Sequence, residues 1–302
     1  MNELFGVAGK VVVITGATGV LGSVMVRHFV AEGAEVVILG RNMEKAQALA
    51  DEVNARSGRP EQGGVAHGGE ALAVRCDVVD RQSVEESCRI TMERYGRVDV
   101  LINGAGGNQP GATVPPDKTI FDLDIEAMRG VVDLNLFGTV IPTMVYARAM
   151  VGRADSGSGA GQERLGQAAG AGKKGQGSII NIASESALRP LTRVAGYGAA
   201  KAAVVNFTKY LCGELALKFG EGLRVNAIAP GFFLTEQNRA LLTNPDGSLT
   251  PRAEAIIAHT PFGRFGEPEE LLGTLQWLAS DASRFVSGTL TVVDGGFDAF
   301  SI

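Results

Sequence analysis

Short apolar runs alternate with longer stretches of helical periodicity along the whole chain, and this alternation restricts the fold more than any other feature. Runs such as VVVIT at 11–15 and SIINIA at 178–183 are typical of strands buried on both faces of a parallel sheet. We therefore predict a doubly wound (Rossmann) α/β fold, with helices on both faces of the sheet and a single domain over residues 1–302. The predicted strands cover residues 10–15, 35–40, 71–76, 98–103, 177–184, 223–229 and 289–293.

Two segments interrupt this alternation, at 56–69 and 152–177, and the second is rich in glycine, alanine and charged residues. Such composition cannot bury enough apolar surface to offset the entropy lost on ordering. We expect flexible surface insertions, with a lid over a binding site as the alternative reading. Units of strand and helix resume after each segment, so neither is expected to mark a domain boundary.

Composition excludes several classes of function. The net charge of -5 supplies no basic surface for nucleic acid. The three cysteines form no CxxC pair and the three histidines have no i, i+4 partner, so we expect neither disulfides nor a metal site. The opening MNELFGVAGK has no apolar signal core and no later apolar run reaches the length of a membrane span, so we expect a cytoplasmic protein without a membrane partner.

A glycine-rich segment joins the first predicted strand to an amphipathic helix. It contains Gly16, Thr18, Gly19, Val20 and Leu21. Glycines at such a junction let backbone amides approach a pyrophosphate, and the helix N-terminus adds partial positive charge. This pattern predicts a dinucleotide site, although a simple tight turn is the alternative for this segment alone.

A tyrosine and a lysine four residues apart form the second chemical feature. Tyr197 and Lys201 lie in a predicted helix, so both project from one face. An ammonium group beside a phenol stabilises the phenolate, and we expect Lys201 to lower the pKa of Tyr197 from its usual value of about 10. A YxxxK pair by itself is usually a surface accident, so this assignment depends on the neighbouring motifs.

Together with Asn103-Gly104-Ala105-Gly106, Ser184 and Pro230-Gly231, these motifs stand in the order and spacing of the short-chain dehydrogenases/reductases. The resemblance covers nearly the whole chain. Two positions depart from the family pattern: the middle glycine of TGxxxGxG is expected at Val20 but stands at Gly19, and the second asparagine of the more frequent NNAG form is Gly104. The resemblance implies hydride transfer between a nicotinamide cofactor and an alcohol or ketone.

Catalytic roles follow from the same resemblance. Tyr197 would be the acid/base, Lys201 would also hold the nicotinamide ribose, and Ser184 would bind the substrate oxygen. Asn135 resembles the asparagine that completes a proton relay to Lys201, with a buried amide that satisfies helix backbone as the alternative. The implied cofactor contacts, besides the glycine-rich segment, Tyr197 and Lys201, are Asp77, Val78, Asn103, Ala105, Gly106, Pro230, Gly231 and Thr235.

The end of the second predicted strand bears on the choice of cofactor. The sequence there reads Leu39-Gly40-Arg41-Asn42, without the carboxylate that would bind an adenosine ribose and repel a 2′-phosphate. Arg41, with Asn42 beside it, favours NADP(H) because a guanidinium can pair with that phosphate. A surface arginine that stacks on adenine would leave NAD(H) usable. Asp77 has its own alternative, as the N-cap of the helix that follows.

Several segments resemble a narrower branch of the family, the D-mannonate oxidoreductases (fructuronate reductases) of the short-chain type, among them GAGGNQP, PGFFLTEQNRALL and VVDGGFDAFSI. This resemblance implies a sugar-acid substrate held by amides and a guanidinium. Arg189 or Arg193 could bind the carboxylate, and either could instead lie at the surface or in a subunit interface. The candidate substrate residues are Asn108, Ser184, Glu185, Arg189, Tyr197, Gln237 and Asn238.

Two other functions compete with this reading. The first is reduction of 3-oxoacyl thioesters or other ketones, and the second, more remote, is nucleotide binding without catalysis. The amphipathic stretch at 268–279 is expected to be a core helix. The family resemblance implies a homo-oligomer, a tetramer or a dimer, with a small-molecule substrate as the other partner.

Overall fold

The computed structural model describes residues 3–57, 68–152, 176–234 and 242–300. Seven strands form one fully parallel sheet in the order β3-β2-β1-β4-β5-β6-β7. All seven predicted strands are present, within two residues at each end. Their bounds are β1 Val11–Thr15, β2 Glu35–Gly40, β3 Ala71–Arg75, β4 Val100–Asn103, β5 Gly177–Ile182, β6 Leu223–Pro230 and β7 Leu290–Val293.

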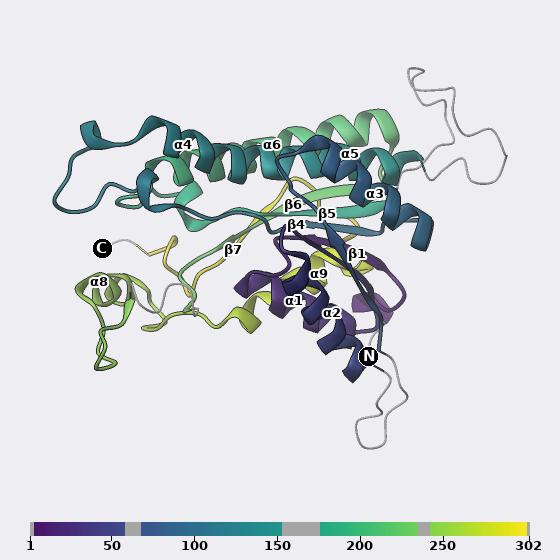
Figure 1. The fold of residues 1–302 in the computed structure, drawn as a ribbon, viewed down its shortest axis with the longest axis horizontal. Coiled ribbons are helices and arrows are strands. Elements are labelled where there is room, and N and C mark those ends of the chain that lie inside the picture. The colour runs from purple at the N-terminus through teal and green to yellow at the C-terminus, as the bar shows by residue number, and fades with distance from the viewer. Residues whose placement is uncertain (1–2, 58–67, 153–175, 235–241, 301–302) are drawn as a thin grey trace.

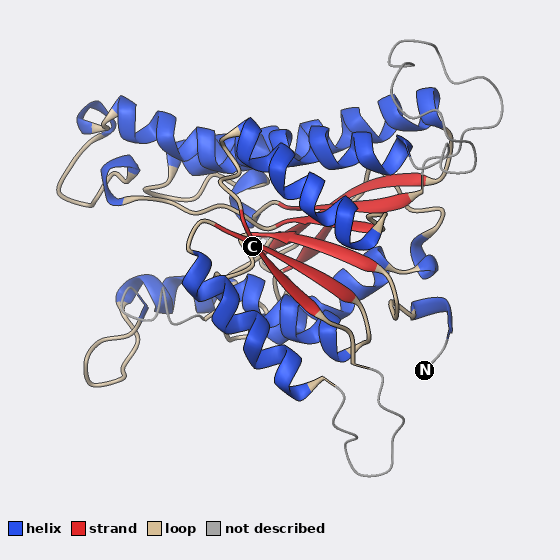
Figure 2. Ribbon diagram, turned by 45° about the vertical axis from the view of Figure 1, so that its right-hand side comes forward, coloured by secondary structure: helices blue, strands red, loops and turns tan. Residues whose placement is uncertain are grey.

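Helices cover both faces of this sheet, as the doubly wound prediction requires (Figures 1 and 2). One face carries α1 (Val20–Ala31), α2 (Met43–Arg56) and α9 (Leu272–Ala279), whose buried side chains share a core with β1 and β2. The other face carries α3 (Arg81–Tyr95), α5 (Gly138–Gly152) and α6 (Ala195–Phe219), centred on the fully buried Tyr146. The predicted fold class is confirmed.

The order of the strands reverses between β1 and β4, and this point is where an open α/β sheet forms a crevice beyond its strand ends. Thr15, Asn103 and Asn181 stand level with one another at those ends. The Asn103 amide nitrogen donates to Asn181 Oδ1 at 2.8 Å and to Thr143 Oγ1 at 2.8 Å. These bonds hold the strand ends, and the loops after them, in a fixed arrangement.

Helix α4 (Ile125–Val132), a π-helical turn (Asp133–Phe137) and α5 run on as one helical segment from Ile125 to Gly152. Its length and composition would allow it to cross a membrane, but this is weak evidence because the core helix of a globular protein passes the same test. Its contacts with α3 and α6 and the buried Asn135 and Tyr146 are those of a core helix.

Shorter elements complete the chain: 3-10 turns at Glu3–Phe5, Pro110–Ala112, Ile120–Asp122, Glu185–Ala187, Pro268–Leu271 and Asp281–Ser283, and helix α8 at Pro251–His259. The stretch predicted at 268–279 is a core helix, with Leu271, Leu275 and Leu278 buried. Most of the predicted insertions lie outside the described residues. The described residues at their edges belong to regular elements: α2 ends at Arg56, α5 ends at Gly152, and β5 begins at Gly177.

Candidate active site

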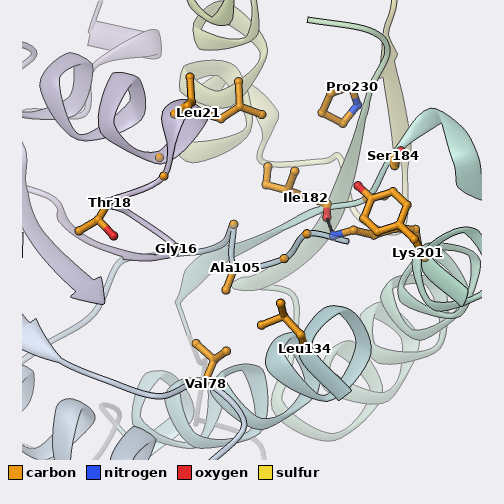
Figure 3. A pocket seen from close by; sticks show the side chains of 18 of the residues that line it. Gly16, Thr18, Leu21, Val78, Ala105, Leu134, Ile182, Ser184, Lys201 and Pro230 are labelled. Carbon is orange, nitrogen blue, oxygen red and sulfur yellow. Dashed lines mark hydrogen bonds between the residues drawn. The ribbon is translucent and has the colours of Figure 1, made fainter. Parts of the chain in front are cut away.

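A cavity of about 550 Å³ lies beyond the carboxyl ends of the central strands, at the point where the strand order reverses. Figure 3 shows Gly16, Thr18 and Leu21 on one side of it and Ser184, Lys201 and Pro230 on the other. The two motifs of the sequence, far apart along the chain, therefore line one space. Its wall includes Gly19, Val20, Arg41, Val78, Ala105, Gly106, Tyr197 and Gly231.

The glycine-rich turn between β1 and α1 requires its glycines for close approach. Gly16 has φ +65°, and a Cβ there would lie 2.7 Å from the Ala105 backbone. A Cβ at Gly22 would lie 2.2 Å from the Gly16 carbonyl oxygen. The Thr15 hydroxyl accepts the backbone N–H groups of Gly104 and Ala105, both at 3.1 Å, and so joins the turn to the loop after β4. The resulting cradle fits a dinucleotide, whose pyrophosphate would lie at the N-terminus of α1.

The end of the cavity that the sequence predicts for the adenosine is formed by residues at the ends of β2 and β3. Gly40 faces Thr18, since a Cβ on Gly40 would meet the Thr18 Cγ2 atom at 3.3 Å, and Arg41 lines the cavity beside them. The Asn42 side chain is the N-cap of α2 and accepts the Lys45 N–H at 3.0 Å. Asp77 is not the N-cap of α3, the alternative role considered for it, because Asp80 occupies that position.

Tyr197 and Lys201 lie one turn apart on α6, next to Ser184 at the end of β5. Lys201 Nζ is almost fully buried and donates to the Ile182 carbonyl oxygen at 2.7 Å (Figure 3). It lies 5.7 Å from the centre of the Tyr197 ring. The Ser184 side chain caps the turn Glu185–Ala187 by accepting the Ser186 N–H at 3.2 Å, which fixes the orientation of the serine.

The pKa of Tyr197 is raised in the structure, whereas the sequence predicted that Lys201 would lower it. Burial raises it above its usual value, and the hydrogen bond from Ser184 offsets part of that rise. Burial also lowers the pKa of Lys201 to about 8. The lysine ammonium is bonded to a carbonyl and stands off the phenol ring, so desolvation of the phenolate outweighs its attraction.

Asn135 sits in the π-helical turn, a rare conformation that often occurs at functional sites. Its amide nitrogen donates to the Val131 carbonyl at 2.8 Å and the Gly107 carbonyl at 2.7 Å, while Oδ1 accepts the Gly107 N–H at 3.0 Å. The amide therefore satisfies helix backbone and also fixes the loop after β4. A Cβ on Gly106 would lie 2.7 Å from Asn135 Oδ1 and 3.1 Å from Lys201 Nζ, so these two side chains flank Gly106 closely.

The residues predicted to bind substrate differ from one another in burial and in their partners. Glu185 is buried, and both its carboxylate oxygens lack a hydrogen-bond partner in the described parts of the chain. Asn108 is exposed and donates to Thr113 at 3.0 Å. Arg189 is ion-paired with Asp298 at 2.8 Å, and this neutralises the guanidinium expected to bind a substrate carboxylate. Thr235, Gln237 and Asn238 lie outside the described residues.

Sequence reasoning missed some lining residues, and the predicted cofactor contact of Asn103 stays a prediction. Asn103 does not line the cavity, because its amide is buried between strand ends. Leu134, Phe232 and Phe233 line it instead. Leu134 and Phe232 each neighbour a predicted residue in the chain, and Phe233 lies two residues from Gly231. That closeness was the signal available, since apolar side chains carry no chemical motif.

Family models agree with this geometry. One described as short chain dehydrogenase matches residues 10–160, and one described as Enoyl-(Acyl carrier protein) reductase matches residues 158–298. The chain belongs to the short-chain dehydrogenase/reductase family. It is therefore an oxidoreductase that acts on an alcohol or a ketone with a nicotinamide cofactor.

Among the relatives of this short-chain dehydrogenase/reductase, an uncharacterized oxidoreductase of Bacillus subtilis (UxuB) is 43% identical, over 97% of this chain and 96% of that one. A 3-oxoacyl-[acyl-carrier-protein] reductase of Synechocystis is 32% identical, over 96% and 98%.

Solved structures extend the comparison. A candidate D-mannonate oxidoreductase from Haemophilus influenza with bound NAD has a TM-score of 0.82 and 37% identity, over 98% and 97% of the two chains. A gluconate 5-dehydrogenase from Burkholderia cenocepacia, in complex with NADP and tartrate, has a TM-score of 0.78 and 30% identity, over 99% of each.

Proposed function

We propose that this oxidoreductase interconverts the secondary alcohol and the ketone of a sugar acid, of the D-mannonate/D-fructuronate type. The observation that carries the chemistry is that Ser184, Tyr197 and Lys201 line the wall of one cavity, with Lys201 almost fully buried. The sugar-acid assignment is supported by the names of two of the most similar solved structures, one a candidate D-mannonate oxidoreductase and the other a gluconate 5-dehydrogenase.

Two side chains would act on the reacting oxygen of the substrate, Tyr197 and Ser184. Tyr197 gives its hydroxyl proton to the carbonyl oxygen of the substrate during reduction and takes it back during oxidation. Ser184 donates a hydrogen bond to the same oxygen and holds it within reach of the phenol. The bound nicotinamide supplies or accepts the hydride. A proton shared between Tyr197 and the reacting oxygen then needs a route to solvent.

Lys201 and Asn135 would provide that route. Lys201 Nζ is held by the Ile182 carbonyl, and Asn135 and Lys201 flank the same glycine, Gly106. The pKa of about 8 at Lys201 lets the amine release and recover a proton near neutral pH. In this arrangement the amide of Asn135 positions the Gly106–Gly107 backbone, and Lys201 carries the proton.

For the cofactor we favour NADP(H), with NAD(H) as the other candidate. Arg41 lines the cavity at the end of β2 and Gly40 presents no carboxylate. A guanidinium there can pair with a 2′-phosphate. Asp77, Val78, Gly231 and Thr235 would complete the cofactor contacts. Similar solved structures hold either NAD or NADP, so they support a nicotinamide cofactor without distinguishing the two. The preference for NADP(H) therefore depends on Arg41.

Reduction of a 3-oxoacyl thioester is the second candidate function, because the Synechocystis relative carries that name. Such a substrate would use the apolar lining of Phe232 and Phe233. Binding without catalysis is supported by no observation, and we do not favour it.

The assembly and the location belong to the same proposal. We expect a homo-oligomer, a tetramer or a dimer, because β7 is a half-exposed edge strand and Leu217 on α6 is 89% exposed. A cytoplasmic location is consistent with the free thiols of Cys76, Cys88 and Cys212.

The decisive experiment follows absorbance at 340 nm with D-fructuronate and either NADH or NADPH. We expect oxidation of the cofactor, and a loss of about 100- to 10,000-fold in kcat for Tyr197→Phe. Tyr210→Phe is the matched control, because Tyr210 lies on the same helix but is 64% exposed. Consumption of cofactor only with a 3-oxoacyl thioester would replace the sugar-acid assignment by the second candidate.

A further inference from the structure

Two arginines meet between the loop that precedes α6 and the first turn of α8. Arg252 is half-buried, and its Nη1 donates to the Thr192 hydroxyl at 3.1 Å. Arg193 is the next residue after Thr192, and its positive charge contributes, after burial, to lowering the pKa of Arg252. The Arg252–Thr192 bond therefore brings Arg252 to the loop that carries Arg193, two residues before α6 begins at Ala195.

In the described parts of the chain, no carboxylate forms an ion pair with Arg193 or with Arg252. Most of the other arginines that the structure describes have such a pair. Arg189, the other arginine of this loop, is paired with Asp298 at 2.8 Å. A pair of close cations without a counter-ion destabilises the free protein, and a bound anion would remove that cost.

The backbone and the helix add two independent observations. Arg193 is the only described residue other than glycine with a positive φ, at 76°, and its carbonyl accepts the Val114 N–H at 3.1 Å. Such strain persists where the surrounding structure enforces it, often at ligand sites. Arg252 lies in the first turn of α8, where the helix dipole disfavours a cation and favours an anion.

The position relative to the cavity suits the far end of a substrate. The loop with Arg193 leads directly into the helix that carries Tyr197, and α8 follows the segment that continues from the cavity residues Phe232 and Phe233. Helices α4 and α8 extend from the same end of the molecule in both views (Figures 1 and 2). Arg193 stands four residues before Tyr197 and neither arginine lines the cavity itself, so a carboxylate bound here would belong to a substrate that extends from Tyr197 out of the cavity.

We propose that Arg193 and Arg252 together bind the carboxylate of the substrate and so select acids over neutral sugars. This inference rests on the proposed function, which it deepens by naming the groups that recognise the acid. A planar carboxylate can accept hydrogen bonds from both guanidinium groups, and the Thr192 hydroxyl holds Arg252 in place for it.

The test compares a sugar acid with its neutral counterpart, by a readout that needs no turnover. With saturating NADPH, D-mannonate is expected to raise the Tm of the wild-type enzyme and D-mannitol is not. Arg193→Gln and Arg252→Gln should each lose that rise, and the Lys variants should recover part of it. Arg284→Gln, an exposed arginine at the opposite ends of the strands, is the matched control and should keep it.

Kinetics provide the second measurement. Each Gln variant should raise KM for D-fructuronate at least about tenfold, as the loss of a charge-assisted hydrogen bond predicts, with the KM for cofactor retained. An unchanged KM, or a Tm response to D-mannonate equal to that of wild type, would overturn the inference, as would variants that change only the oligomeric state. If the wild type ignores D-fructuronate yet D-gluconate stabilises it through Arg252, the substrate assignment fails and the anion site stands.

Discussion

Glu185 is the residue whose environment agrees least with its charge. It follows Ser184 directly, it is 1% exposed, and neither carboxylate oxygen has a hydrogen-bond partner in the described structure. Burial, together with the charges of Asp298 and Asp294, raises the pKa of Glu185 to about 7, against a smaller opposing effect of Arg189. The carboxyl therefore holds its proton to a higher pH than an exposed glutamate does.

The raised pKa of Glu185 predicts a loss of stability as pH increases. The folded-state pKa lies above the unfolded one, so the favourable protonated form contributes fully below pH 4.5 and is lost as pH rises through about 7. Between pH 5 and pH 8.5 the Tm of Glu185→Gln should fall less than that of the wild type, with a difference on the order of 2 kcal/mol in unfolding free energy. Parallel Tm curves for the two proteins would contradict this.

Gly106 is a second residue at which a small substitution should change activity. A methyl group there would lie 2.7 Å from Asn135 Oδ1 and 3.1 Å from Lys201 Nζ, so one of these side chains must move. Gly106→Ala is predicted to lower kcat by about 100-fold or more, because small displacements of reacting groups are costly. Gly213→Ala, with open space around its Cβ, is the control that should retain full activity.

At the scale of elements, a buried guanidinium joins β6 to the end of α9. Arg224 is 7% exposed and donates to the carbonyls of Leu278 at 3.1 Å and Ser280 at 3.2 Å, and to the Ser283 hydroxyl at 2.7 Å. The same carbonyls also accept hydroxyl hydrogen bonds, Leu278 from Ser178 at 2.7 Å and Ser280 from Ser283 at 3.2 Å, so Arg224 is one of several donors at the end of this helix. Arg224 therefore acts as a side-chain cap that fixes α9 against the sheet.

Removal of this cap should destabilise the fold without touching the active site. For Arg224→Met we expect a loss of about 2–4 kcal/mol in the free energy of unfolding, since three hydrogen bonds from one buried guanidinium are lost at once. Urea unfolding gives the value, and Arg284→Gln, exposed nearby, should change it by less than about 0.5 kcal/mol. An equal effect of both substitutions would show that the buried bonds contribute nothing.

At the scale of the whole molecule, the cavity connects elements that are remote in sequence. Its wall draws on the ends of β1, β2, β4, β5 and β6, so a ligand that fills it ties both halves of the sheet together. Any ligand that binds only the folded state raises its stability in proportion to the logarithm of its concentration. The cofactor should therefore stabilise the entire domain.

This coupling allows the cofactor preference to be measured by unfolding. NADPH at a hundred times its Kd should stabilise the protein by about 2.7 kcal/mol. Arg41→Gln is expected to weaken NADPH binding about tenfold, the loss of one charge-assisted pair, and to leave NADH binding unchanged. Stronger stabilisation of the wild type by NADH than by NADPH, or an insensitivity of both to Arg41, would favour NAD(H).

The fold and the composition of the central cavity could be predicted from local patterns. The run Val11–Thr15 predicts a buried strand, because burial on both faces requires continuous apolar residues. The glycines after it predict a tight turn, because a close backbone approach requires glycine. The spacing of Tyr197 and Lys201 on one helix is equally local.

Side-chain pairing between remote segments could not be predicted in this way. Nothing near Arg189 in sequence indicates that Asp298 neutralises it, and nothing near Arg193 indicates that Arg252 joins it. The sequence by itself determined the strands, the dinucleotide cradle and the Ser184–Tyr197–Lys201 motif, since each depends on neighbours along the backbone. Only the tertiary structure decided that Asp298 pairs with Arg189 and that burial raises the pKa of Tyr197, because charge pairing and desolvation depend on what folding brings together.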